Sequence, residues 1–260
     1  MKIRVPLNKV TIIKTMPSIK YFKLLTTERK GEWSDDGVNI VGIRDDSLLS
    51  LPKEQKHNDI FIVIVQNKIK GYFIGSTEPG VSSYQGSRKN RGVAHLRVDD
   101  YIFKFVNGTK GVRKHGYLAT IKKYVKVDRD RDESGGISKN PYLIAFEEYY
   151  DAGGDLHNVD AEFIHFHFGG STTWDIGVSN FSHGCQVIAG DRWFYTAYQR
   201  TDYHNIDKHY HGAYIDFIRE IKSGIAISEN KIYYHLFNSE KINENIFNFR
   251  KWKVDLIKKN

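Results

Sequence analysis

Cysteine is nearly absent from this sequence, because the 260 residues include only Cys185. A single cysteine excludes an intramolecular disulfide framework, so disulfide bridges give no information about the cellular compartment. Residues 1–15 alternate charged and apolar side chains and lack the apolar core of a secretory signal peptide. No apolar run approaches the length of a transmembrane helix. We therefore expect no transmembrane segment and no classical export signal.

Basic residues outnumber acidic residues, which gives a formal net charge of +8 and a pI near 9.3. This excess favours an anionic partner, for which nucleic acid and an anionic cell-wall polymer are both candidates. A solvated, lysine-rich surface gives the same count. Charge alone therefore leaves the partner open.

The composition favours strands, because tyrosine and phenylalanine occur 16 and 15 times in a chain that is 40% hydrophobic. Ile60–Val65 is an unbroken apolar run, which is typical of a strand buried on both faces. The turn at Gln66–Lys68 pairs this strand with Ile69–Ile74 in a hairpin. Further strands are predicted at Lys2–Ile13, Tyr101–Val106, Tyr117–Ile121, Tyr124–Val127, Tyr142–Phe146 and Lys231–Phe237.

Two helices are predicted late in the chain. Asp191 can cap a helix from Arg192 to about Gln199. A second helix, ended by Gly224, is indicated by apolar residues at helical spacing, namely Tyr214, Phe217, Ile218 and Ile221. The sequence thus predicts a mostly-β (α+β) fold with a few short helices. We expect one domain over residues 1–260, in which residues 1–55 and 200–260 are embellishments around the core.

Within the segment Glu162–Phe168, apolar and polar residues alternate from Ile164 onward, as they do in a strand whose side chains point to two different faces. One face carries Ile164, Phe166 and Phe168, and we expect it to face the core. The opposite face then carries Phe163, His165 and His167. The strand therefore presents two histidines together on the side away from the core.

Cys185 lies eighteen residues after His167, in the tetrapeptide Ser182–Cys185 of sequence Ser-His-Gly-Cys. A single cysteine with histidines nearby in sequence is a candidate nucleophile, although a lone cysteine is also a common small core residue. The loop 169–180 is long enough to turn back and bring Cys185 beside the two histidines. This pattern favours a thiol enzyme.

The stretch resembles the catalytic domain of the L,D-transpeptidases (YkuD-type), and in particular a divergent, phage- or effector-associated branch. The resemblance rests on His167, on Ile176-Gly177 and on Ser182–Cys185, followed by Gln186-Val187. It covers about 25 residues. It implies a single β-rich catalytic domain of that type. Typical members carry Arg or Asn two residues after the cysteine, where this chain has Val187.

The resemblance also implies roles for individual residues. Cys185 would be the nucleophile and His167 its base, oriented by the backbone carbonyl of Phe168. The amides of Gly184 and Cys185 would bind the oxyanion, and Ser182 and His183 would shape the pocket. Residues expected to contact the substrate are His165, Phe168, Trp174 and Arg192.

The implied reaction is acyl transfer or hydrolysis on the peptide stems of peptidoglycan, through a thioester on Cys185. It requires no cofactor or metal, and the expected partner is peptidoglycan rather than nucleic acid. The site of action would be the periplasm or cell wall, reached by a non-classical route; otherwise the protein would be cytoplasmic.

Two other classes remain open. A zinc-dependent hydrolase could use His165, His167, His183 and Cys185 as ligands. A non-catalytic cell-wall-binding, phage or secretion-system module could keep the same fold. The turn with Asp128, Asp130 and Asp132 resembles the start of a calcium loop, but Glu133 and Lys139 stand where such a loop needs glycine and glutamate. We predict a polar turn there.

Overall fold

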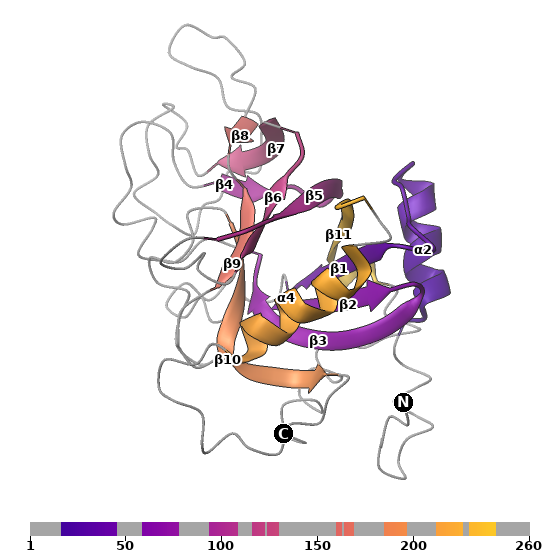
Figure 1. Cartoon of the computed structure of the whole chain (residues 1–260). Helices are drawn as coiled ribbons and strands as arrows, with labels where there is room; N and C mark the ends of the chain where they lie inside the picture. The colour runs from indigo at the N-terminus through magenta and orange to yellow at the C-terminus, as the bar shows by residue number, and fades with distance from the viewer. Residues whose placement is uncertain are drawn as a thin grey trace, which may run out of the picture.

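The computed structural model describes residues 17–45, 59–77, 94–108, 116–122, 124–129, 160–162, 164–168, 185–196, 212–225 and 229–242. In these ranges eight strands close into a barrel (Figure 1). Its strands, in the order in which they pair around the barrel, are β1 (Val38–Arg44), β11 (Ile232–Asn238), β5 (Asp100–Val106), β6 (Tyr117–Thr120), β9 (His165–Phe168), β10 (Gln186–Thr196), β3 (Lys68–Ser76) and β2 (Asp59–Val65). The mostly-β prediction is confirmed.

A second, three-stranded sheet extends the barrel wall at one end (Figure 1). It consists of β4 (Ala94–Leu96), β7 (Tyr124–Arg129) and β8 (Asp160–Glu162). Along the chain β4 precedes β5, β7 follows β6, and β8 precedes β9. The small sheet therefore continues three neighbouring barrel strands in the same lateral order, and it lies on the side of the barrel that contains β9.

The barrel wall is buried on both faces where β1 and β2 pair. Val38 and Ile40 of β1 belong to the interior core, whereas Val41 and Ile43 belong to a second cluster on the outside. β2 alternates in the same way and is buried at every position. The unbroken apolar run of Ile60–Val65 was predicted to be a strand of this kind, with a hairpin partner, and both features are confirmed.

Helix α4 (Gly212–Ile225) packs across the strands β10, β3 and β2 and fills part of the interior. The four apolar residues predicted at helical spacing are all buried in the interior core. Phe217 stacks on Phe166 of β9, with 5.8 Å between ring centroids. The Tyr214 hydroxyl donates to the carbonyls of Gly116 (2.7 Å) and Phe166 (3.4 Å), and its burial raises the pKa of that phenol. The helix therefore supports β9 directly.

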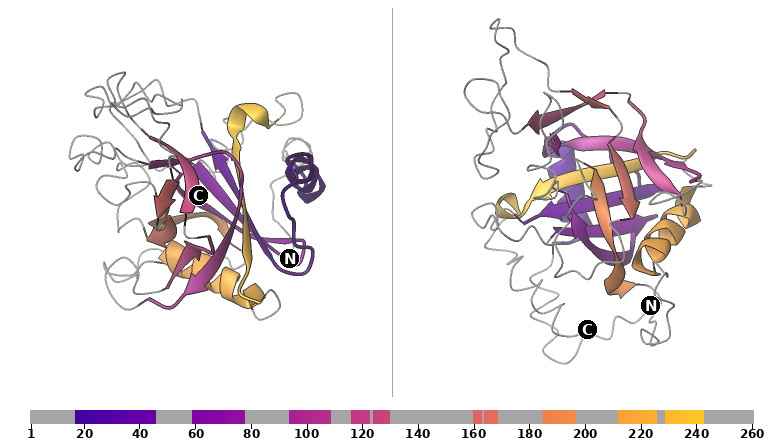
Figure 2. Two further views of the ribbon diagram at one scale, coloured as in Figure 1. Left: turned by 90° about the horizontal axis from the view of Figure 1, so that it is seen from above. Right: turned by 90° about the vertical axis from the view of Figure 1, so that its left-hand side faces the viewer.

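The outer cluster is covered by a helix that was not predicted, α2 (Ile19–Glu28; Figure 2). Ser18 caps it, because its hydroxyl accepts a hydrogen bond from the amide of Tyr21. Phe22 of α2 contacts Phe237 of β11, with 5.9 Å between ring centroids. The local signal was present in the sequence, since a capping serine precedes Ile19, Phe22 and Leu25 at a spacing of three.

A charged cluster attaches the end of α2 to the barrel. The Asp100 carboxylate lies 2.7 Å from the guanidinium of Arg29 and 2.7 Å from Nδ1 of His235. Nε2 of His235 faces the Asn39 side-chain oxygen at 3.2 Å, and Trp33 stacks on the imidazole ring. Burial lowers the pKa of His235, and the hydrogen bond to Asp100 offsets part of that effect.

Asp100→Ala should lower the free energy of unfolding by about 2–3 kcal/mol, because it leaves Arg29 and His235 without their shared anionic partner in a mostly buried place. Chemical denaturation monitored by fluorescence measures the change. Asp35→Ala is the matched control, since Asp35 pairs with Lys23 in the solvent and exposed pairs contribute little. An equal decrease in the free energy of unfolding in the two variants would contradict the anchoring role of Asp100.

The helix predicted from Arg192 to about Gln199 is wrong over the described residues, because β10 extends to Thr196. Trp193 pairs with Phe73 and Tyr195 with Tyr72, with irregular register between these pairs. Sheet pairing with β3 decides the conformation, since local propensity is a weak preference that tertiary contacts override.

The two terminal segments both contribute to the barrel. β1, from residues 1–55, and β11, from residues 200–260, pair in parallel from Val38↔Ile232 to Arg44↔Asn238. The strands predicted at Lys2–Ile13 and Tyr142–Phe146 lie outside the described residues. In the ranges that the structure describes, no helix combines the length and the apolar character needed to cross a membrane.

Candidate active site

The two histidines of β9 lie on the outer side of the barrel wall. Between them, Phe166 points into the interior and is completely buried, and Ile164 also belongs to the interior core. This confirms the predicted alternation for these residues. His165 and His167 are nevertheless only 4% and 5% exposed, so both imidazoles are covered on the outer side as well.

Strand β10 pairs in parallel with β9, and the register relates Cys185 to the histidines. Gln186 pairs with Phe166, Val187 with His167, and Ile188 with Phe168. Paired residues of neighbouring strands project to the same face of a sheet. Val187 therefore shares the outer face with His167, while Ile188 belongs to the interior core.

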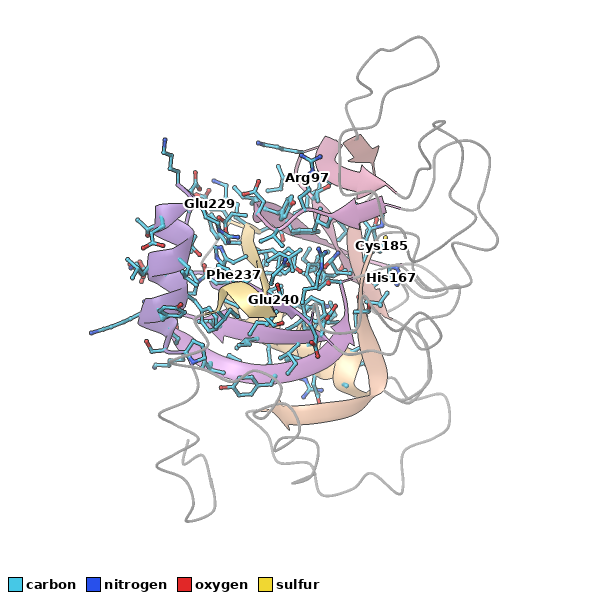
Figure 3. All side chains as sticks on the ribbon, turned by 180° about the vertical axis from the view of Figure 1, so that it is seen from behind. Arg97, His167, Cys185, Glu229, Phe237 and Glu240 are labelled. Carbon is cyan, nitrogen blue, oxygen red and sulfur yellow. The ribbon has the colours of Figure 1, made fainter. Side chains whose placement is uncertain are left out.

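Cys185 is the residue immediately before β10; it forms no disulfide and is half-buried. It lies two positions before Val187, so the alternation of a strand directs it to the outer face, with His165 and His167. One register step back from Gln186 brings Cys185 beside His165, and His167 lies two residues further along, about 6.6 Å. Figure 3 labels Cys185 and His167 on the same side of the barrel.

Tyr117 of β6 packs on the first of these histidines. Its ring meets the His165 imidazole edge-on, with 4.8 Å between centroids. β6 is the other neighbour of β9, through the pair Ala119↔His165. His165 thus lies between an aromatic ring on one side and the cysteine strand on the other, whereas His167 lies nearer the end of β9.

On the inner side of the wall, a buried polar network lies directly behind Cys185. Gln186 is completely buried, and its amide oxygen accepts a hydrogen bond from the Tyr234 hydroxyl at 2.8 Å. Its amide nitrogen donates to the carbonyl of Thr77 at 3.5 Å. Neither hydrogen bond was predicted. A polar residue on the core-facing side of a strand, next to the cysteine, is a signal that could have indicated a buried polar contact.

Thr77 is in turn held by charged residues at the ends of β1 and β2. The Asp59 carboxylate accepts hydrogen bonds from the amide (2.6 Å) and hydroxyl (2.7 Å) of Thr77, and another from the amide of Asp45. Arg44 donates to the Thr77 hydroxyl at 2.9 Å. Burial raises the pKa of Asp59, and these hydrogen bonds oppose the shift.

The other predicted site residues are placed only in part. Phe168 and Arg192 belong to β9 and β10, but only their backbone is described. The predicted pocket residues Trp174, Ser182, His183 and Gly184 lie outside the described residues. So do Asp130 and Asp132 of the acidic turn, whereas Asp128 pairs with His95 in the small sheet.

Among the described residues, no group of three or more His, Cys, Asp or Glu side chains could hold a metal ion. His183, one of the four ligands considered for a zinc site, is not among those residues. The register of β9 and β10 directs Cys185 to the same face of the wall as His165 and His167. A cysteine beside a histidine is an arrangement suited to activating a thiol.

Comparisons with protein-family models, with curated proteins and with solved structures found no significant match to this chain.

Proposed function

We propose that this protein is a cysteine-dependent acyltransferase or hydrolase that acts on the peptide stems of peptidoglycan. The observation that supports it best is the parallel register of β9 and β10. Continued by one residue, the alternation of β10 directs Cys185 to the face that carries His165 and His167. The resemblance of His167 and Ser182–Cys185 to the L,D-transpeptidase motif supplies the substrate class.

In the proposed reaction His167 takes the proton of the Cys185 thiol, and the thiolate attacks the carbonyl that precedes a terminal D-amino acid. The carbon–nitrogen bond breaks, and the D-amino acid leaves after its nitrogen takes up the proton from His167. The resulting thioester is transferred to an amine or hydrolysed by water. A free thiol has a pKa of about 8.5, so an adjacent imidazole is needed to form the thiolate at neutral pH.

The residue at position 187 suggests how the second step, transfer of the acyl group from Cys185 to an acceptor, proceeds. Typical family members place Arg or Asn there, whereas this valine is completely buried beside His167 and offers neither charge nor a hydrogen bond. Without a charge-assisted contact at this position, the acceptor is held less firmly. We therefore propose trimming or D-amino-acid exchange on tetrapeptide stems in preference to efficient crosslinking.

This reaction belongs to the periplasm or cell wall, where its substrate is located. The net charge of +8 is compatible with attraction to an anionic wall polymer. The alternative roles, as a zinc hydrolase or a non-catalytic module, are distinguished by metal content and by the dependence of products on Cys185.

The experiment is incubation with tetrapeptide-rich muropeptides, followed by mass spectrometry of the products, with Cys185→Ala as the blank. Trimmed or D-amino-acid-exchanged stems that disappear in the blank are the expected result. Crosslinked dimers as the main product would contradict the role of Val187 but not that of Cys185. The absence of any product that depends on Cys185 would exclude the thiol enzyme, and the absence of product in both proteins would favour the binding module.

A further inference from the structure

Gln186 occupies an unusual position, because it follows the proposed nucleophile directly but points away from it. Cys185 is directed to the outer face of the wall, whereas Gln186 is completely buried on the inner side, beside its strand partner Phe166. A primary amide in an apolar interior is unfavourable unless its oxygen and nitrogen are hydrogen-bonded. Both are bonded here, the oxygen to Tyr234 of β11 and the nitrogen to Thr77, the residue that follows β3.

The partner of the amide oxygen reaches it across the barrel. Tyr234 belongs to β11, which is not adjacent to β10 in the barrel. Its ring is held edge-on by Phe166, at 4.8 Å, and by Phe103, at 5.7 Å. Gly42 makes room for the hydroxyl, because a Cβ at that position would lie 2.5 Å from the Tyr234 oxygen. The packing of the aromatic ring therefore fixes the position of the Tyr234 hydroxyl that donates to Gln186.

The partner of the amide nitrogen is equally constrained. The carbonyl that accepts from Gln186 belongs to Thr77, which is held by the buried Asp59 and Arg44. Arg44 also donates to the carbonyl of Leu96 in β4, at 2.8 Å. The amide of Gln186 thus joins the beginning of β10 to a network that extends over four further strands or their ends.

We propose that Gln186 is a positioning residue for the nucleophile, held by Tyr234 and Thr77, and that it sets the direction in which Cys185 faces His167. This inference rests on the proposed thiol chemistry. Cys185 precedes the first paired residue of β10, where strand pairing alone constrains the chain least. Hydrogen bonds are directional, so they fix the rotation of this strand end in a way that an apolar side chain of similar size does not.

Two substitutions test the proposal. Tyr234→Phe removes one oxygen and keeps the aromatic packing, and Gln186→Met keeps the length of the side chain but removes its hydrogen-bonding groups. Both should slow turnover on tetrapeptide muropeptides about 10- to 100-fold through kcat, with little change in KM, because misplacing a catalytic group by about 1 Å has effects of this size. The pH midpoint for iodoacetamide labelling of Cys185 should rise towards about 8.5.

Tyr101→Phe is the matched control. Like Tyr234→Phe it removes one hydrogen-bonded tyrosine hydroxyl, but this hydroxyl donates to the backbone carbonyl of Arg97, at 2.6 Å, and not to Gln186. It should leave both readouts unchanged. If Tyr234→Phe and Gln186→Met keep the kcat and the labelling midpoint of the wild type, the positioning role of Gln186 is overturned, and the proposed function is not affected. An equal loss of kcat and an equal rise of the labelling midpoint in Tyr101→Phe would also overturn that positioning role, because the effects would then reflect general destabilisation. A wild-type protein that labels like an ordinary thiol and forms no product would overturn the proposed function, and this inference with it.

Discussion

His167→Ala should reduce turnover at least about 100-fold, since general acid–base catalysis contributes effects of this order. The substitution removes the imidazole that matches the family position and that shares the outer face with Cys185. His165→Ala should reduce turnover only about tenfold, because His165 is expected to position the substrate or its neighbours. Steady-state kinetics on muropeptides and the rate of iodoacetamide labelling near pH 7 measure both effects.

The labelling rates separate this account from its alternatives. If His167 generates the thiolate, its loss should slow labelling of Cys185 as well as turnover. Labelling that is indifferent to both histidines would contradict activation of the thiol. Complete loss of turnover in both variants, together with stoichiometric zinc in the purified protein, would support a metal site. The register makes this comparison informative, since it brings His165 nearer to Cys185 along the strands than His167.

Gly75→Ala should have the largest effect on stability, with a loss of more than about 4 kcal/mol or failure to fold, a size that is seen only for severe structural conflicts. Gly75 lies in β3 between Asp59 of β2 and Ile188 of β10. A Cβ at Gly75 would overlap the backbone carbonyl of Val187, and Phe61 lies against the same position. This overlap can be relieved only if β3 and β10 separate, because a backbone atom in a paired strand cannot rotate away.

Thermal and chemical denaturation test this prediction. Leu24→Ala is a suitable comparison, because Leu24 is 53% exposed on α2 and surface substitutions usually change stability by less than about 0.5 kcal/mol. A Gly75→Ala protein with the stability of the wild type would show that β10 does not pack against β3 as described. Cys185 labelling in any residual folded fraction would report whether the start of β10 has moved.

The elements that could be predicted from the sequence are those with a clear local pattern. Ile60–Val65 and its hairpin partner, the helix around Phe217 and the alternation at Phe166 each carry a period or a run that reports burial directly. Helix α2 had such a signal after Ser18. The segment Arg192–Thr196 shows the opposite case, because a capping aspartate favoured a helix and pairing with β3 made a strand.

What the sequence could not supply are the pairings between distant strands. The parallel pair β1–β11 joins residues almost 200 positions apart, and closure of the barrel depends on it. The same holds for the candidate site. A candidate nucleophile and candidate histidines could be named from a motif, but the hydrogen bond between Gln186 and Tyr234 crosses the barrel and follows only from the three-dimensional fold.

The central claim, that Cys185 is an acylated nucleophile, is tested most directly by intact-protein mass spectrometry after rapid mixing with a tetrapeptide muropeptide and acid quenching. The expected result is a transient mass increase equal to the stem fragment without its terminal D-amino acid, located on Cys185 and absent in Cys185→Ala. A substrate that is processed by Cys185→Ala as fast as by the wild type, with no adduct on the wild-type cysteine, would contradict it.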